Sequence, residues 1–259
     1  MNATVQLAAS PSVVAGVQPR PAKANEARLN YQLLARATGV LFLITYATSI
    51  PAALSLYVPA LTDRGYITGA GTADFGVLLG AFLEVLLIVA NIGTTLTLFP
   101  VLKRQNEVLA LGYVTARLVE SAFIAVGLLS MLTLVTLRRE AVGADAAALT
   151  AVGQALVALH DWTFLLGPGF VVGVGNGMTL GYLMYRTGLI PRPLATLGLI
   201  AGPLLCASGT AVLFGVVAQG SAGQIIPTMP EFFWELLLGI YLTVWGFRPQ
   251  AAKALLGAA

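Results

Sequence analysis

The sequence predicts an all-α membrane protein, a polytopic bundle of six transmembrane helices. Hydrophobic residues make up 58% of the 259 residues and charged residues only 10%, against about 25% charged in an ordinary soluble domain. The mean hydropathy of the chain is +0.86. Its apolar segments are continuous and lack the alternation of polar and apolar residues found in strands of a membrane β-barrel.

Six segments are long and apolar enough to cross the hydrocarbon core of a bilayer, which takes about 20 helical residues. Because lipid offers the backbone no hydrogen-bond partners, each segment is expected to be a helix. The predicted spans are residues 37–58, 75–101, 111–137, 159–185, 194–217 and 231–247. We expect one transmembrane domain over residues 29–248, a disordered cytoplasmic tail at 1–28 and a short cytoplasmic tail at 249–259.

The basic residues of the loops predict the orientation of the bundle. Ten Lys and Arg residues fall on the side of the two termini, and three fall on the opposite side. Since cytoplasmic loops carry the excess of basic residues, both termini are expected in the cytoplasm. This topology places residues 143–158 outside, as a surface helix that leads into the fourth span. It also places Trp234 at the outer membrane interface, where indole rings are enriched.

Several function classes find no support in the sequence. The formal net charge is +3, but the basic residues are spread over the loops, so no nucleic-acid partner is indicated. There is no Walker A sequence for ATP, and neither an HExxH nor a CxxC spacing for a metal ion. A single cysteine, Cys206, excludes a disulfide scaffold. The sequence therefore predicts no cofactor and no metal, and a lipid bilayer as the main partner.

Polar residues inside the predicted spans are the candidates for a functional site. A charged side chain at the bilayer centre costs about 2.5–3.5 kcal/mol on the scale from membrane-insertion experiments, which is lower than the cost from simulations. Such residues therefore usually face a bundle interior. The rise of a helix places the candidates in two tiers at different depths. The outer tier holds Glu84, His160, Asp161, Glu231 and Glu235, and the inner tier holds Asn91, Arg117, Glu120 and Asn176.

The two tiers favour different interpretations. Arg117 and Glu120 are three residues apart on one helix face, so their pairing can be purely structural. The outer tier has four carboxylates and one potential cation, His160, which favours a proton relay, a cation site or general-acid chemistry. For Asp161 and Glu231, a position among hydrated lipid headgroups is the alternative.

Short acidic motifs recur near the outer ends of the even-numbered spans. They are residues 82–87, 161–166 and 233–238, in which a carboxylate precedes a run of apolar residues. One interpretation is that three helical hairpins form parallel repeats around one polar pocket.

The fourth span is rich in glycine. The triplet at residues 167–169 (Gly-Pro-Gly) is expected to kink the helix. A glycine at every fourth position lets a neighbouring helix approach closely. This glycine stripe consists of Gly169, Gly173, Gly177 and Gly181.

Five stretches of the chain carry a resemblance to a known family. They are ARATGVL at residues 35–41, YVTARLVE at 113–120, HDWTFLLGPG at 160–169, Asn-Gly at 176–177 and FFWELL at 232–237. These stretches resemble a bacterial family of six-span membrane proteins, the domain-of-unknown-function 4386 family, over roughly residues 30–248. The resemblance implies six spans and a location in the bacterial inner or plasma membrane. It implies no activity and no catalytic residues.

Three functions are compatible with this pattern. In the first, the polar residues line an intramembrane cavity where a small or lipidic molecule or a cation binds or crosses, with Glu84, Asp161 and Glu235 handling protons or the cation. In the second, the protein is an intramembrane enzyme that uses buried carboxylic acids and His160 as general acid and base. We favour the first, because two polar tiers form a path whereas an enzyme needs one focus.

The third function is non-enzymatic. In it the glycine stripe serves as the docking face of an assembly or regulatory partner, and this partner can be a second copy of the chain.

Overall fold

The computed structural model describes the chain except residues 1–29, 70–73, 141–142, 144 and 258–259. The described residues contain helices and no strands. Six helical segments are long and apolar enough to cross a membrane, namely Tyr31–Leu56, Asp74–Leu102, Glu107–Glu140, Ala146–Thr187, Arg192–Leu213 and Ala222–Val244. The predicted all-α bundle of six membrane helices is therefore confirmed. The tail predicted at residues 1–28 lies outside the described residues.

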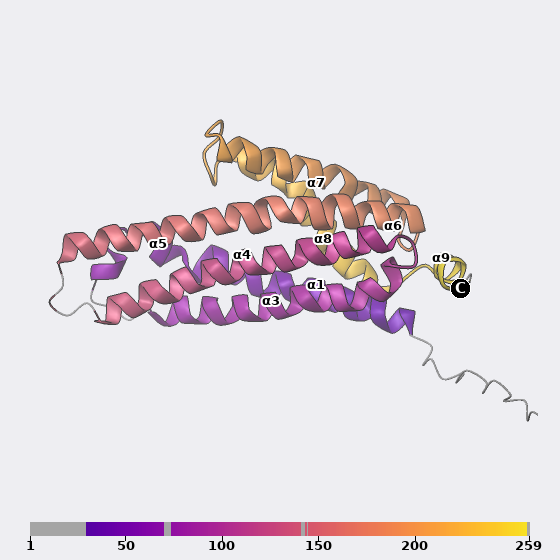
Figure 1. The fold of residues 1–259 in the computed structure, drawn as a ribbon, viewed down its shortest axis with the longest axis horizontal. Coiled ribbons are helices and arrows are strands. Elements are labelled where there is room, and N and C mark those ends of the chain that lie inside the picture. The colour runs from indigo at the N-terminus through magenta and orange to yellow at the C-terminus, as the bar shows by residue number, and fades with distance from the viewer. Residues whose placement is uncertain (1–29, 70–73, 141–142, 144, 258–259) are drawn as a thin grey trace, which may run out of the picture.

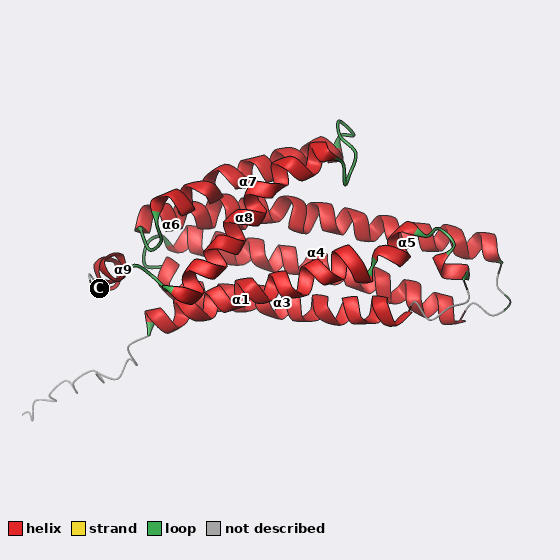
Figure 2. Ribbon diagram, turned by 180° about the vertical axis from the view of Figure 1, so that it is seen from behind, coloured by secondary structure: helices red, strands yellow, loops and turns green. Residues whose placement is uncertain are grey.

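The helices follow one another along the chain with short connections (Figures 1 and 2). The α-helices are α1 (Tyr31–Pro51), α2 (Val58–Thr62), α3 (Asp74–Leu102), α4 (Glu107–Glu140), α5 (Ala146–Leu166), α6 (Gly181–Thr187), α7 (Arg192–Leu213), α8 (Ala222–Val244) and α9 (Pro249–Leu256). The remaining elements are the π-helices η1 (Ala52–Leu56), η3 (Gly167–Val171) and η4 (Gly173–Leu180) and the 3₁₀-helix η2 (Tyr66–Thr68).

The six spans form a closed ring in chain order. Helix α1 packs against α3, α3 against α4, and α4 against α5. The continuation of α5 through η4 and α6 packs against α7, α7 packs against α8, and α8 closes the ring against α1. The first and last described residues consequently lie at the same end of the bundle (Figure 1). Each span presents one side to the interior of the ring.

Two apolar cores occupy the two ends of the ring. The larger core lies toward the end with the termini and includes the fully buried side chains of Leu102, Tyr113, Leu180 and Phe247. Helix α9 joins this core through Ala252, so part of the predicted short tail is a packed helix. The smaller core, at the other end, consists of the buried residues Tyr57, Ala60, Tyr66, Ile67, Val77, Met131, Leu134 and Val135.

The helices α3, α4 and α5 extend beyond the other spans at the end away from the termini (Figure 1). The helical segment Ala146–Thr187 has 42 residues, which gives about 63 Å at 1.5 Å per residue against a hydrocarbon core of about 30 Å. In Figure 1 the hairpin of α7 and α8 stops well short of the far ends of α3, α4 and α5. An ion pair of Asp74 with Arg138 and a second with Arg139 (2.8 Å) join α3 to α4 there.

The segment predicted to form a surface helix leading into the fourth span is helical from Ala146 onward. Helix α5 begins at Ala146 and continues without a break into the fourth span. The Asp145 side chain caps its first turn by accepting a hydrogen bond of 2.9 Å from the Ala147 amide. Because the segment that follows is rich in alanine, the best helix former, nothing in the sequence ends the helix before the span.

Proline and glycine widen the helical repeat in two of the spans. The π-helix η1 follows Pro51 at the end of the first span, and η3 begins at Gly167 in the predicted Gly-Pro-Gly kink. Proline lacks the amide hydrogen that an α-helical turn needs, so the chain closes wider turns around it. The sixth span begins at Ala222, earlier than predicted, and runs through Pro227 and Pro230.

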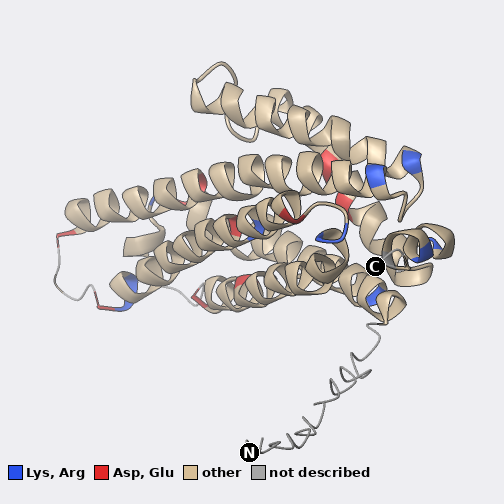
Figure 3. Cartoon of the chain, turned by 45° about the vertical axis from the view of Figure 1, so that its right-hand side comes forward, with Lys and Arg blue, Asp and Glu red and all other residues tan. Residues whose placement is uncertain are grey.

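The Lys and Arg residues of the described part of the chain are unevenly divided between the two ends of the bundle (Figure 3). The end with the termini carries Arg36, Lys103, Arg104, Arg186, Arg192, Arg248 and Lys253. The other end carries Arg64, Arg138 and Arg139. The predicted orientation, with the first of these ends in the cytoplasm, rests on this distribution.

Cysteine labelling tests this orientation. In a Cys206→Ser background, an Arg64→Cys variant is expected to react with a membrane-impermeant maleimide in intact cells, because Arg64 is exposed at the predicted outer end. A Lys253→Cys variant, exposed at the other end, should react only after the cells are permeabilised. The reverse pattern would show that both termini face outward.

Candidate functional site

A cavity of about 240 Å³ lies inside the ring of spans. Its wall takes residues from α1, η1, α3, α4, α5, η3, α7 and α8, so every span contributes. Much of the wall is apolar, with Ile50, Leu87, Ile124, Phe164 and Leu205. The volume lies just below the range of about 300–1,000 Å³ that is typical of sites for drug-sized ligands, so the cavity suits a small molecule.

Polar residues of both predicted tiers line this one cavity. They are Glu84, Asn91, Arg117, Glu120, His160, Glu231 and Glu235. The tiers therefore meet around a single space and do not form two separate levels of a path. Among the predicted candidates, Asp161 and Asn176 lie outside the cavity lining.

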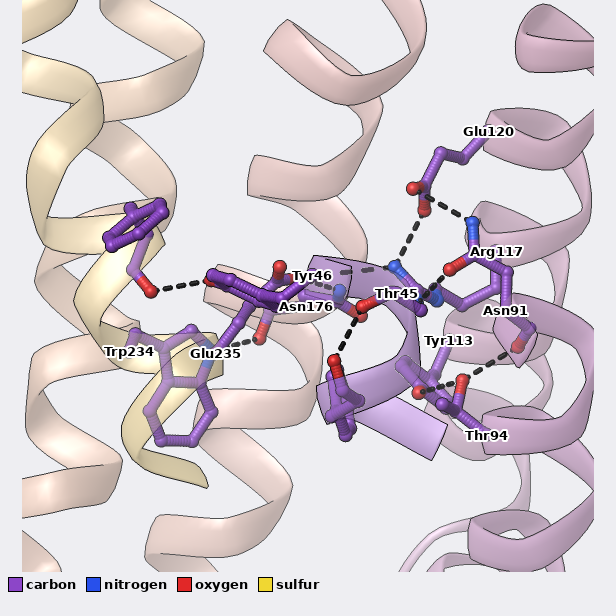
Figure 4. A network of polar contacts seen from close by, with 12 residues as sticks. Thr45, Tyr46, Asn91, Thr94, Tyr113, Arg117, Glu120, Asn176, Trp234 and Glu235 are labelled. Atoms are coloured by element: carbon purple, nitrogen blue, oxygen red, sulfur yellow. Dashed lines mark hydrogen bonds and ion pairs between the residues drawn. The ribbon is translucent and has the colours of Figure 1, made fainter. Parts of the chain in front are cut away.

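Arg117 is held in a buried network through its two Nη atoms, while its Nε has no hydrogen-bond partner among the described residues (Figure 4). Its Nη1 donates to Glu120 Oε2 at 2.7 Å, and its Nη2 donates to Asn91 Oδ1 at 2.6 Å. The Asn91 amide in turn donates to Glu120 Oε1 at 3.1 Å. The Glu120 carboxylate neutralises the positive charge of Arg117, and the neighbouring helices α3 and α4 supply all three side chains.

Glu235 lies beside this network and not in a separate outer tier. Its Oε1 is 3.9 Å from Arg117 Nη1 and accepts a hydrogen bond from the Asn176 amide (Figure 4). The Trp234 indole donates to the backbone carbonyl of Asn176 at 3.1 Å, which fixes the turn that carries Asn176. Trp234 is therefore fully buried in the bundle, and its predicted place at the membrane interface is wrong.

Glu231 is the least satisfied polar side chain of the cavity. The residue is 3% exposed, and neither carboxylate oxygen has a hydrogen-bond partner among the described residues. A Cβ atom built at Gly177, on η4 in the fourth span, would lie only 2.6 Å from Glu231 Oε2. The alternative of a hydrated place among headgroups does not hold for Glu231, because the side chain is enclosed by the ring.

Glu84, Tyr57 and His160 form a second cluster of polar side chains. The Tyr57 hydroxyl donates to Glu84 Oε2 at 2.9 Å. The His160 ring packs edge-on against the Tyr57 ring, with 5.4 Å between the ring centroids. The sequence analysis missed Tyr57, because a tyrosine at the end of a span is typical of an interfacial anchor.

Asp161 faces away from the central cavity. Its side chain is 48% exposed and lines a second cavity of about 320 Å³ at the far end of the bundle, together with Asp63, Arg64 and Tyr66. Its Oδ1 is 3.8 Å from Nδ1 of His160, which lines the central cavity. These two adjacent residues therefore stand between the two cavities.

The glycine stripe packs against α7 of the same chain. A Cβ built at Gly173 would lie 2.7 Å from the Gly202 carbonyl oxygen, and one built at Gly177 would overlap Gly202 Cα. Gly181 is buried against the backbone of the same helix, at Leu199. Since α7 covers most of the stripe, the stripe is not a free docking face for a partner.

The described residues contain no group of three His, Cys, Asp or Glu side chains placed to hold a metal ion. The site instead combines apolar walls, one neutralised arginine and carboxylates with differing numbers of partners. Tyr46, also missed by the sequence analysis, adds an aromatic ring that lies 5.1 Å from the ring of Phe232. Both rings line the cavity.

Comparison with known proteins agrees with the resemblance found in the sequence. The family model described as "Domain of unknown function (DUF4386)" matches residues 37–246, about four-fifths of the chain. No curated protein and no solved structure matches the chain. The matched region covers most of each of the six spans and all the polar residues of the cavity. The chain is a multi-pass membrane protein that belongs to the DUF4386 family.

Proposed function

We propose that the protein binds a small, largely apolar molecule in the central cavity of its membrane domain. The observation that carries this proposal is the buried carboxylate of Glu231, which lines an apolar-walled cavity without a partner among the described residues. A buried polar group without a hydrogen bond costs about 1–3 kcal/mol. A ligand that supplies the missing donor would recover this cost, so the site is suited to an occupant with one polar group.

The same arrangement supports coupling of ligand binding to proton movement. Glu84 and His160 line the central cavity, and Asp161 lines the second cavity 3.8 Å from His160. Carboxylates and histidines in series form proton relays in membrane transporters. We therefore propose His160 as the link between the two cavities, and proton-coupled transport across a bacterial inner membrane as the physiological form of this binding.

Intramembrane catalysis is the second candidate function. It is favoured by the gathering of both polar sets around one space, because an enzyme needs a single focus. The group of Tyr57, Glu84 and His160 would then provide general acid and base. Chemical analysis of a ligand recovered after incubation separates the two functions, since a binding protein or transporter returns it unchanged.

Filling the cavity tests the proposed binding. Ala53 lines the cavity on η1, whereas its neighbour Leu54 is 72% exposed toward the surroundings of the bundle. We expect a panel of amphiphiles of roughly ten heavy atoms, an amine, an alcohol and a carboxylic acid, to include members that raise the melting temperature of the purified protein. Ala53→Trp should abolish this rise, and Leu54→Trp should preserve it.

The proposal fails if no member of the panel stabilises the wild-type protein. It also fails if the compounds stabilise the wild type and Ala53→Trp equally, because binding would then occur elsewhere. Both variants should first be shown to give the same helical circular dichroism spectrum as the wild type.

A further inference from the structure

We infer that the ligand carries a protonated amine and that Glu231 is the carboxylate that binds it. This inference rests on the proposed function and names the substrate class of the same cavity. It is carried by the balance of charges around the cavity, the unpartnered oxygens of Glu231 and two aromatic rings that line the same cavity.

The charges of the cavity wall favour a cation. Four carboxylates line it, those of Glu84, Glu120, Glu231 and Glu235, and Arg117 is the only arginine or lysine among the lining residues. Arg117 is committed to Glu120 and Asn91, with Glu235 at 3.9 Å. Even with His160 counted beside Arg117, the wall holds more carboxylates than potential cations, so its charges suit an ammonium group better than a carboxylate ligand.

Glu231 offers the acceptors that an ammonium group needs. Both of its oxygens are buried and without a hydrogen bond among the described residues. A primary ammonium carries three N–H donors and so can satisfy both oxygens of one carboxylate. Hydrogen bonds between charged groups are about twice as strong as those between neutral groups, which makes an amine a better occupant than an alcohol.

Two aromatic rings line the same cavity as Glu231. Phe232 follows Glu231 in α8, and its ring lies edge-on to that of Tyr46 with 5.1 Å between the centroids. The Tyr46 hydroxyl is already used, because it donates to the Phe232 carbonyl at 2.5 Å. What Tyr46 offers a ligand is thus its ring, and aromatic faces attract ammonium groups.

An inorganic cation fits this space less well. Calcium takes six to eight oxygen ligands, and magnesium keeps an octahedral shell with several waters. The described residues bring no three His, Cys, Asp or Glu side chains together to hold a metal ion, and much of the cavity wall is apolar. The occupant that matches both the carboxylate and the walls is an organic amine with an apolar body.

The test compares two probes of the same shape, 2-phenylethylamine and 2-phenylethanol. Their affinities are measured by titration calorimetry on the full-length protein in lipid nanodiscs, with empty nanodiscs as the blank. We expect the amine to bind at least about 10-fold more tightly than the alcohol, and Glu231→Gln to weaken the amine by roughly 10- to 100-fold. In the same Glu231→Gln variant, the affinity for the alcohol should change by less than about 3-fold. Glu107→Gln, the same change at an exposed site, should leave both affinities unaltered.

Each outcome bears on a different claim. If both probes bind with equal affinity, or if Glu231→Gln leaves the amine affinity unchanged, the amine inference is overturned while the proposed function stands. If neither probe binds, both are overturned. The comparison of the two probes on the wild-type protein needs no variant, so it remains decisive if Glu231→Gln does not fold.

Discussion

Replacing Arg117 with methionine is expected to lower the free energy of unfolding by about 3–5 kcal/mol. The change leaves the carboxylate of Glu120 and the amide oxygen of Asn91 buried without their strongest donor. It also removes the positive charge nearest to Glu235. Thermal and denaturant unfolding of the purified protein in detergent would measure the loss.

A double substitution separates the loss of the ion pair itself from the cost of leaving the Glu120 carboxylate buried without its partner. Removing one partner of a buried ion pair is costly because the other charge remains, whereas replacing both with apolar residues is often close to neutral. Arg117→Met combined with Glu120→Met should therefore recover a large part of the stability lost in the single variant. Arg104→Met, at an exposed position between α3 and α4, is the matched control and should have little effect. A double variant less stable than Arg117→Met would contradict the structural role of the pair.

Substituting alanine for Gly177 is expected to destabilise the protein by about 3 kcal/mol, the upper end of the range for overpacking a core. The new Cβ would overlap Gly202 Cα and lie 2.6 Å from Glu231 Oε2. Since one of these neighbours is backbone, α7 would have to move away from η4 as a whole. The melting temperature in detergent measures this effect.

Gly112→Ala is the matched control for the helical glycines. Nothing lies within 4 Å of a Cβ at Gly112 on α4, so the substitution should be neutral or stabilise by up to about 1 kcal/mol through the higher helix propensity of alanine. Equal shifts of the melting temperature in the two variants would show that the contact between Gly177 and α7 is looser than the structure indicates. The Gly177 variant should also weaken amine binding, because its Cβ crowds the Glu231 carboxylate.

The spans were predictable because hydrocarbon imposes a strong and local requirement. A segment that crosses it must be apolar and helical over about 20 residues, and both properties can be read within a short window of sequence. The errors lie at the membrane boundaries, where this requirement ends. The sixth span shows this, because α8 begins at Ala222 and runs through Pro227 and Pro230, earlier than predicted.

The polar candidates were predictable as a set but not in their grouping. Distance along a helix gives the depth of a residue, whereas its direction around the helix gains meaning only when the neighbours are known. His160 and Asp161 are adjacent in the sequence yet line different cavities. Glu235, assigned to the outer tier by depth, lies beside Arg117. Tyr57 and Trp234 look like interfacial anchors in the sequence, but both are fully buried in the structure.

The sequence by itself determined that this chain is a bundle of six membrane helices, that it carries costly polar residues within them, and to which family it is similar. It did so because hydropathy and helical rise are properties of single segments. Only the tertiary structure decided that the spans close into a ring, that both polar tiers meet in one cavity and that Glu231 is left without a partner. Those facts depend on which helices pack side by side, and packing joins residues that are far apart in the chain.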